Sequence, residues 1–189
     1  IVLVYDGELP VALEAVVQSF QAALPLHIVR LPHNVGLGHA LNQGLPHCRH
    51  EWVMRMDTDD ICLPQRFAQQ CAHILAHPDL DLLGGQIAEF EHQPQQQQHS
   101  RQVPLSHDEI CHFARRRNPF NHMAVAYRKT AVAAAGGYRH HLYMEDYNVW
   151  LRMLAAGARS ANLKHKLILA RNGQAMLLRR RHGNTRSHA

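Results

Sequence analysis

The stretch that most constrains the fold of this chain is residues 51–66, which read EWVMRMDTDDICLPQR. Its apolar beginning, residues 52–56, predicts a short buried strand, and three carboxylates follow at Asp57, Asp59 and Asp60. Side chains alternate between the faces of a strand, so Asp57 and Asp59 can point to the same side. Divalent cations prefer such oxygen ligands, and ligands of open α/β sheets bind beyond the carboxyl ends of the strands. The pattern indicates a cation site, with a solvated acidic turn that caps the next helix as the alternative.

Four other motifs stand around this stretch. Residues 33–45 (HNVGLGHALNQGL) precede it, and it is followed by NPFNH at 118–122, GGY at 136–138 and MEDYNVWLRMLAAG at 144–157. In this order, the chain resembles the family 2 glycosyltransferases with the GT-A fold, and most closely the bacterial members that build cell-surface polysaccharides. The resemblance covers nearly the whole chain. It implies an α/β fold with a mixed, mainly parallel sheet flanked by helices on both faces, within a single domain over residues 1–189.

The resemblance also implies roles for acidic residues. Asp59 would hold a divalent cation, Mn²⁺ or Mg²⁺, and Asp57 would face both the ribose and this cation. Asp146 would be the general base that acts on the acceptor hydroxyl, with Glu145 orienting the site. The alternative for this pair is a structural one, since acidic residues favour a helix N-terminus through its dipole. Asp6 would contact the nucleotide base, because a carboxylate can accept the imide N–H of uracil, or it is simply a turn residue.

Several basic residues are further candidates. Arg117 could hold phosphate oxygens, and His122 could touch the acceptor or the diphosphate, although a structural histidine fits this position equally well. His182 lies in a segment from which some GT-A enzymes supply a metal ligand, with a solvated basic tail as the alternative. His73 and His77 are spaced i, i+4 and could chelate a metal, but no third ligand is evident in the sequence, which favours a surface pair.

The implied reaction moves a sugar from a nucleotide-diphosphate sugar to a saccharide or lipid-linked acceptor. One base without a second, nucleophilic carboxylate implies inversion at the anomeric carbon. A nucleotidyltransferase and a non-catalytic relative with the same fold are the alternatives. The net charge of +5 also fits a polyanion-binding module. Such a module has no use for the acidic motifs, and aromatic residues for stacking make up only 6% of the chain, so no nucleic-acid partner is expected.

The sequence also bears on location. No apolar run approaches the length of a membrane span, no signal peptide is visible, and four scattered cysteines without a C-x-x-C pair indicate reduced thiols. We therefore expect a cytoplasmic protein, with peripheral association at the inner face of the cell membrane left open. By the usual length of a βαβ unit, family members carry about thirty residues before this start. We expect a truncated relative whose sheet has a gap or a substitute strand between residues 1–5 and 52–56, and whose own activity is open.

Hydrophobic patterning predicts the separate elements. Residues 1–5, 26–31 and 52–56 are expected as parallel neighbours in one sheet. A helix over residues 9–23 should carry Leu13, Val16, Val17 and Phe20 on one face, and residues 92–100 (HQPQQQQHS) predict a flexible surface loop. The other expected strands are residues 82–89, 123–127 and 167–170. Five other helices are expected. One ends at residue 45, a second follows Pro64 with Phe67, Cys71, Ile74 and Leu75 at helical spacing, and a third starts from a capping box at 106–109. The last two cover residues 130–135 and 146–156.

Overall fold

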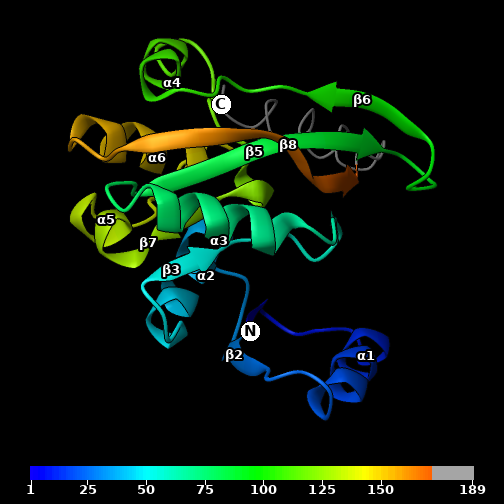
Figure 1. Cartoon of the computed structure of the whole chain (residues 1–189). Coiled ribbons are helices and arrows are strands. Elements are labelled where there is room, and N and C mark those ends of the chain that lie inside the picture. Colours follow the sequence, from blue (N-terminus) through cyan, green and yellow to red (C-terminus); the bar gives the residue numbers. More distant parts are fainter. Residues whose placement is uncertain (172–189) are drawn as a thin grey trace, which may run out of the picture. The chain divides into compact units, whose positions relative to one another are not determined.

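The computed structural model describes residues 1–171, which divide into two compact units. The first unit comprises Ile1–Val53 and Lys129–Met153, and the second comprises Met54–Arg128 and the chain from Leu154 onward. Figure 1 labels most of the elements of both units. Each unit draws on two separate stretches of the sequence, and a single domain over residues 1–189 stays a prediction.

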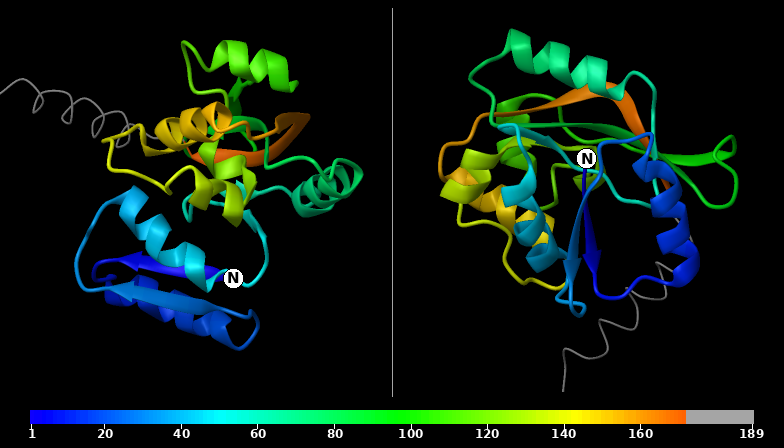
Figure 2. Two further views of the ribbon diagram at one scale, coloured as in Figure 1. Left: turned by 90° about the vertical axis from the view of Figure 1, so that its left-hand side faces the viewer. Right: turned by 90° about the horizontal axis from the view of Figure 1, so that it is seen from below.

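The first unit is built on two parallel strands. β1 (Val2–Asp6) pairs with β2 (His27–Leu31) in one continuous parallel register, and α1 (Val11–Gln21) connects them. α2 (Leu37–Gly44) follows β2, and it lies on the opposite side of this strand pair from α1 (Figure 2). These four elements are the predicted ones.

The apolar face of α1 is exposed. No residue of α1 is buried, and Leu13, Val16 and Phe20 are each more than half exposed. A sheet of two strands offers little surface on which a helix of this length can bury a face. The predicted helix is therefore present, with its apolar face exposed in the part of the chain that the structure describes.

The first unit continues through η1 (Leu45–His47) and, much later in the sequence, through α5 (Lys129–Ala134) and most of α6 (Glu145–Ala155). Gly136 and Gly137 follow α5 with φ angles of 79° and 67°. Residues with a Cβ rarely adopt this left-handed conformation, so the two glycines end α5 as predicted.

The second unit is built on a mixed sheet. The order of the strands in this sheet is β3-β7-β5-β8-β4, and β6 pairs with β5 outside this path. β3 (Trp52–Met54) crosses the boundary between the units, and the other five strands belong to the second unit. The two long strands, β5 (Leu82–Phe90) and β8 (Ser160–Arg171), are parallel and lie side by side in Figure 1. Three short strands run antiparallel to their partners, namely β4 (Ile61–Cys62), β6 (Gln97–Arg101) and β7 (Ala126–Arg128).

The strands do not form the single sheet that the sequence predicts. β1 and β2 make a two-stranded sheet of their own, whereas β3 (Trp52–Met54) belongs to the six-stranded sheet. The prediction of three parallel neighbours in one sheet is therefore wrong among residues 1–171, and the gap expected between residues 1–5 and 52–56 stays a prediction. Apolar runs identify strands, but they do not say which strands pair, because pairing depends on contacts far apart in the sequence.

Two elements are longer than their polarity suggests. The expected loop over residues 92–100 is wrong in its second half, because β6 pairs antiparallel with β5 there. β8 covers 12 residues rather than the four expected, since it continues through the exposed residues 164–166. A strand at a sheet edge or with an exposed stretch satisfies its backbone through pairing without needing an apolar sequence.

The helices of the second unit are α3 (Arg66–Ala76), α4 (His107–Phe113) and the short η2 (His122–Ala124). The predicted capping box starts α4: the side chain of Ser106 accepts from the backbone N–H of Glu109, and the Glu109 carboxylate accepts from the backbone N–H of Ser106. This reciprocal pairing satisfies two of the N–H groups that a helix leaves free at its first turn.

The burial pattern of α3 does not follow its apolar spacing. Its buried residues are Arg66 and Gln70, whereas Phe67 and Leu75 are exposed. The apolar spacing therefore locates the helix but not its buried face, since the two buried side chains are polar.

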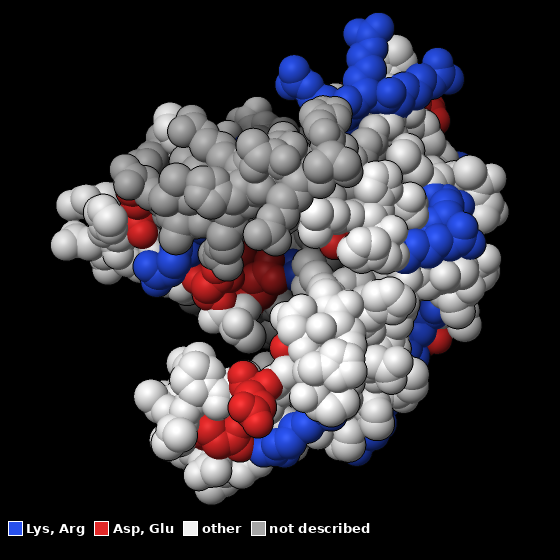
Figure 3. Space-filling model, turned by 180° about the vertical axis from the view of Figure 1, so that it is seen from behind, with Lys and Arg blue, Asp and Glu red and all other residues white. Residues whose placement is uncertain are grey.

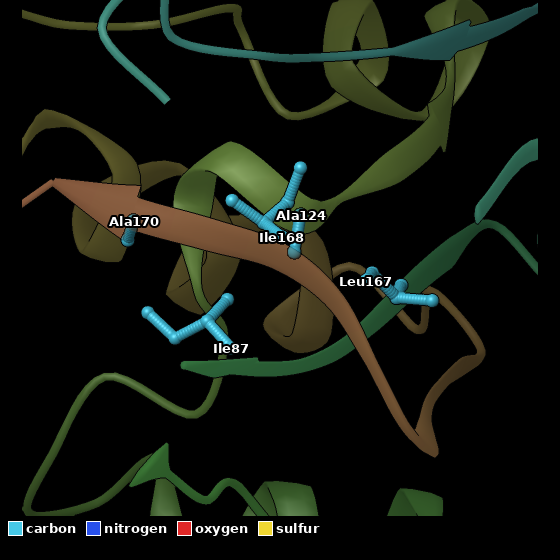
Figure 4. Packing of buried hydrophobic residues seen from close by; sticks show 5 residues of the cluster. All are labelled: Ile87, Ala124, Leu167, Ile168 and Ala170. Carbon is cyan, nitrogen blue, oxygen red and sulfur yellow. The ribbon is translucent and has the colours of Figure 1, made fainter. Parts of the chain in front are cut away.

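The core of the second unit lies between the long strands and η2. Figure 4 shows five of its buried side chains, Ile87 of β5, Ala124 of η2, and Leu167, Ile168 and Ala170 of β8. In the first unit, α6 buries Trp150 and Met153 as predicted.

Gly84 lies where β5 approaches β8 closely. A Cβ atom at this position would overlap Oδ1 of Asn162 and would lie 2.9 Å from Cδ1 of Phe120. Asn162 cannot move freely, because its Nδ2 donates to the carbonyls of Pro104, at 2.7 Å, and Pro119, at 3.0 Å.

We therefore expect Gly84→Ala to lower the free energy of unfolding by ~1–3 kcal/mol, the usual cost of overpacking a core. Urea denaturation followed by circular dichroism measures it. Lys164→Ala, at an exposed position of β8, is the control and should change stability little. A Gly84→Ala variant as stable as the wild type would mean that Asn162 can give way.

Candidate active site

The three carboxylates after β3 gather at one place. Asp57, Asp59 and Asp60 each offer one oxygen, and these oxygens all lie within 4.8 Å of one another. β3 ends at Met54, so a turn, rather than alternation along a strand, brings the three together. Asp59 is exposed, and Asp57 and Asp60 are half-buried. We call these three residues the acidic cluster.

A buried arginine that sequence reasoning missed holds one member of the cluster. The guanidinium of Arg55 is 6% exposed and donates to both carboxylate oxygens of Asp57, with Nη1 at 2.6 Å from Oδ2 and Nη2 in a shorter contact with Oδ1. Such a two-pronged pair fixes the orientation of a carboxylate as well as neutralising it. The only hint in the sequence is an arginine inside an otherwise apolar run.

Asp60 does not cap the following helix. Its Oδ1 accepts from the backbone N–H of Arg171 at 2.8 Å, and α3 begins six residues later without a side-chain cap. Burial raises the pKa of Asp60 to about 6, and repulsion from Asp57 and Asp59 adds to the increase. The capping alternative is therefore wrong for Asp60.

The acidic cluster fits a divalent cation. Its donors are carboxylate oxygens, the type that Mg²⁺ and Mn²⁺ take. In addition, Oδ2 of Asp60 is buried and lacks a hydrogen-bond partner among the residues the structure describes. A cation beside this oxygen would compensate its burial, which is costly when unpaired.

The histidine and arginine candidates of this unit differ in burial. His122 opens η2 and is buried, and its pKa lies well below the usual range because burial, and then the charge of Arg55, disfavours its protonation. His122 is therefore neutral at neutral pH. Arg117 follows α4 and is exposed. Substrate contacts by either residue stay predictions.

Asp6 organises the loop before α2. Its two carboxylate oxygens accept from the backbone N–H groups of Val35, at 2.7 Å, and Gly36, at 3.1 Å. Helix N-termini attract anions, and here the anion is the chain's own side chain. The sequence did not indicate this pairing, which joins residues about thirty positions apart, and the base contact of Asp6 stays a prediction.

Glu145 and Asp146 are the first residues of α6, and both are half-buried. α2 approaches this helix start closely: a Cβ atom on Gly38 would lie 3.3 Å from Cγ of Glu145. Asn42 of α2 also grips the backbone of Tyr138, accepting from its N–H at 2.9 Å and donating to its carbonyl at 2.7 Å. α2 thus packs against Glu145 and fixes the backbone at Tyr138, seven residues before α6.

Other candidates lie apart from these groups. The rings of His73 and His77 stack with centroids 4.2 Å apart on α3, and no third ligand joins them among residues 1–171. His182 lies outside the described residues.

Figure 3 shows that acidic side chains gather in patches on the face it draws, with basic side chains beside them. Within the described part, no helix is long and apolar enough to cross a membrane.

Comparison with known proteins identifies the class of enzyme. Residues 1–141 match the sequence model of glycosyl transferase family 2, and the chain belongs to this family. Its fold is that of two solved glycosyltransferases: TarS of S. aureus (residues 1–349) in complex with UDP-GlcNAc, and the mannosyltransferase PcManGT of Pyrobaculum calidifontis in complex with GDP-Man and Mn²⁺. The first has a TM-score of 0.70 at 19% identity and covers 90% of this chain and 49% of that one. The second has a TM-score of 0.66 at 16% identity and covers 95% and 50%.

Two sequence relatives are closer. The chain is 49% identical over 184 residues to the amylovoran biosynthesis glycosyltransferase AmsE of Erwinia amylovora, covering 97% of this chain and 68% of that protein. It is 34% identical over 168 residues to the UDP-Gal:alpha-D-GlcNAc-diphosphoundecaprenol beta-1,3-galactosyltransferase of Escherichia coli, covering 89% and 61%. The predicted family, the GT-A fold and the enzyme class are confirmed.

The raised pKa of Asp60 has a consequence for stability. A carboxyl whose pKa rises from 3.8 to about 6 on folding binds its proton more tightly in the folded state. The free energy of unfolding therefore falls as the pH rises through this window.

We expect Asp60→Asn to melt at a higher temperature than the wild type in EDTA above about pH 7, because asparagine keeps the acceptor for Arg171 without a charge to bury. The advantage should disappear below about pH 4, where wild-type Asp60 is protonated in both states. Scanning fluorimetry across this range measures it. Asp79→Asn, at an exposed ion pair with Arg159, is the matched control. A wild type that is at least as stable as Asp60→Asn above pH 7 would contradict the assignment.

Proposed function

We propose that this glycosyltransferase moves a sugar from a nucleotide-diphosphate sugar to a saccharide or lipid-linked acceptor during synthesis of a bacterial polysaccharide. The observation that carries the proposal is the acidic cluster, with three carboxylate oxygens within 4.8 Å and one buried oxygen without a hydrogen-bond partner. Support for the substrates comes from the sugar nucleotides and the diphospholipid acceptor in the names of similar proteins. By this proposal the enzyme works in the cytoplasm, and peripheral contact with the membrane would bring it to a lipid-linked acceptor.

Asp59 would hold the divalent cation, Mn²⁺ or Mg²⁺, with Asp57 beside it and towards the ribose. A cation bound there supplies positive charge to the diphosphate leaving group as the glycosidic bond breaks. Asp59 is the exposed member of the cluster, which leaves its carboxylate accessible to a cation carried by a donor. Asp57 is held by Arg55 and presents a fixed acceptor to the ribose.

Asp146 would take the proton of the acceptor hydroxyl while its oxygen attacks the anomeric carbon. The new glycosidic bond forms on the face opposite the departing nucleoside diphosphate, so the configuration inverts. Glu145, packed beside Gly38, would orient this site. Asp146 belongs to the first unit and the cluster to the second, so the proposal requires both to reach the same donor.

The remaining contacts follow the chemistry of each side chain. The carboxylate of Asp6 accepts two backbone N–H groups through one lone pair on each oxygen, which leaves acceptor capacity for a base imide. Arg117, exposed in the segment after α4, can meet phosphate oxygens. His122 is neutral and buried, so it would act as a hydrogen-bonding group rather than as a charge.

The cation assignment predicts that Asp59→Asn abolishes Mn²⁺-dependent binding of the donor, because the change removes a charged oxygen ligand. Calorimetric titrations with UDP and with GDP, each with and without Mn²⁺, measure this. Asp79→Asn is the matched control at an exposed site of the same unit. Equal Mn²⁺-dependent affinity in Asp59→Asn and wild type would remove the cluster from the mechanism.

The base assignment predicts that Asp146→Asn lowers the rate of sugar transfer by at least ~10²–10⁴-fold, the usual contribution of general-base catalysis. Donor binding should stay nearly unchanged, because the base acts on the acceptor. Glu145→Gln should cost less. The test measures the transfer rate and the donor affinity of the wild type and of both variants. If Asp146→Asn loses transfer and donor binding in parallel, Asp146 stabilises the start of α6 and is not the base.

A further inference from the structure

Arg55 is fixed in the second unit by its backbone as well as by its side chain. Its N–H donates to the carbonyl of Val125 at 3.0 Å, and its own carbonyl accepts from Nη2 of Arg66 at 2.6 Å. Arg66 is anchored in turn by Gln70, whose side chain accepts from Nε of Arg66 at 2.9 Å. The guanidinium of Arg55 therefore reaches Asp57 from a rigid base.

The pair changes what the acidic cluster offers to a cation. Three ionised carboxylates would carry a charge of −3, and Arg55 with its +1 reduces the charge of these four side chains to −2. Arg171 places a further cation beside them, with its Nε 3.4 Å from the carbonyl oxygen of Asp59. Each oxygen of Asp57 already accepts one hydrogen bond from Arg55. A cation that used Asp57 would have to share these oxygens with a guanidinium that repels it.

We propose that Arg55 is a positioning residue that withholds Asp57 from a free divalent cation and reserves it for the sugar-nucleotide donor. This rests on the function proposed above. With Asp57 held, the cluster binds a cation alone only weakly, and the cation binds firmly when the donor's diphosphate brings further oxygen ligands and negative charge. Arg55 thereby couples binding of the cation to binding of the donor.

The test measures this coupling directly. Mn²⁺ affinity is determined by electron paramagnetic resonance of the free ion, first without nucleotide and then with saturating UDP or GDP. Arg55→Gln should bind Mn²⁺ alone roughly three- to tenfold more tightly, because a charge near the cation is removed and both Asp57 oxygens are released. Its affinity for the nucleotide in the presence of Mn²⁺ should stay equal or fall, so that the coupling between the two ligands decreases.

A merely structural role would not give this result, since general damage to the site weakens both ligands. Arg55→Lys keeps the charge but can bind only one oxygen of Asp57 at a time. The Mn²⁺ affinity of Arg55→Lys should lie between those of the wild type and Arg55→Gln. Arg55→Lys also serves as the test variant if Arg55→Gln fails to fold. Arg159→Gln makes the same change at an exposed ion pair in the same unit and should leave Mn²⁺ affinity unchanged.

The two levels of the proposal fail differently. If Asp59→Asn retains wild-type binding of Mn²⁺, the acidic cluster is not the cation site, and the cation assignment in the proposed function is wrong. If Asp59→Asn loses Mn²⁺ while folded Arg55→Gln or Arg55→Lys binds it no more tightly than wild type, the role of Arg55 is overturned and the cation site stands.

Discussion

The second unit depends on one buried cation, the guanidinium of Arg66. Arg66 is 1% exposed, and its guanidinium donates to the carbonyls of Arg55 and Val125 and to the side-chain amide oxygen of Gln70, while its Nη1 is buried without a hydrogen-bond partner among the described residues. Nε2 of Gln70 donates in turn to the carbonyl of Ala124 at 3.0 Å. Removing an ion from water costs several kcal/mol, and burial lowers the pKa of Arg66 accordingly. The arrangement is stabilised because the guanidinium satisfies carbonyls where β3 ends and β7 is about to begin, and so fixes the backbone from which the acidic cluster follows.

Those parts of the fold that depend on neighbours in sequence could be predicted. The capping box before α4 and the glycines after α5 concern groups a few residues apart, and both are present as expected. The acidic cluster could also be predicted, because its three carboxylates lie within four positions of the sequence and one turn brings them together. Contacts between distant residues could not be predicted in this way. The apolar spacing of α3 pointed to Phe67, whereas the buried side is that of Arg66 and Gln70, whose partners come from β3 and η2.

The same limit explains what was missed in the first unit. In the glycine-containing loop before α2, the N–H groups of Val35 and Gly36 donate to the carboxylate of Asp6. A phosphate there would compete with an attached carboxylate whose effective concentration is high. The loop is better suited to holding Asp6 in place than to cradling a phosphate. Asn42 likewise joins α2 to Tyr138 across 96 residues, so the start of α6 depends on a helix that the sequence places far away.

Charge balance links the cluster to donor binding. Arg55 offsets one of the three negative charges of the cluster, so a free cation is held less strongly than by three unpaired carboxylates. Three unpaired carboxylates would hold the cation whether or not a donor is present, and binding of the cation would no longer depend on the donor. A counter-ion inside the protein preserves this dependence without removing the carboxylates, because it leaves Asp59 accessible while Asp57 stays paired. The rigid support of Arg55 by Arg66 matters for the same reason, since a mobile guanidinium could swing away when the cation arrives and leave all three carboxylates free to bind it.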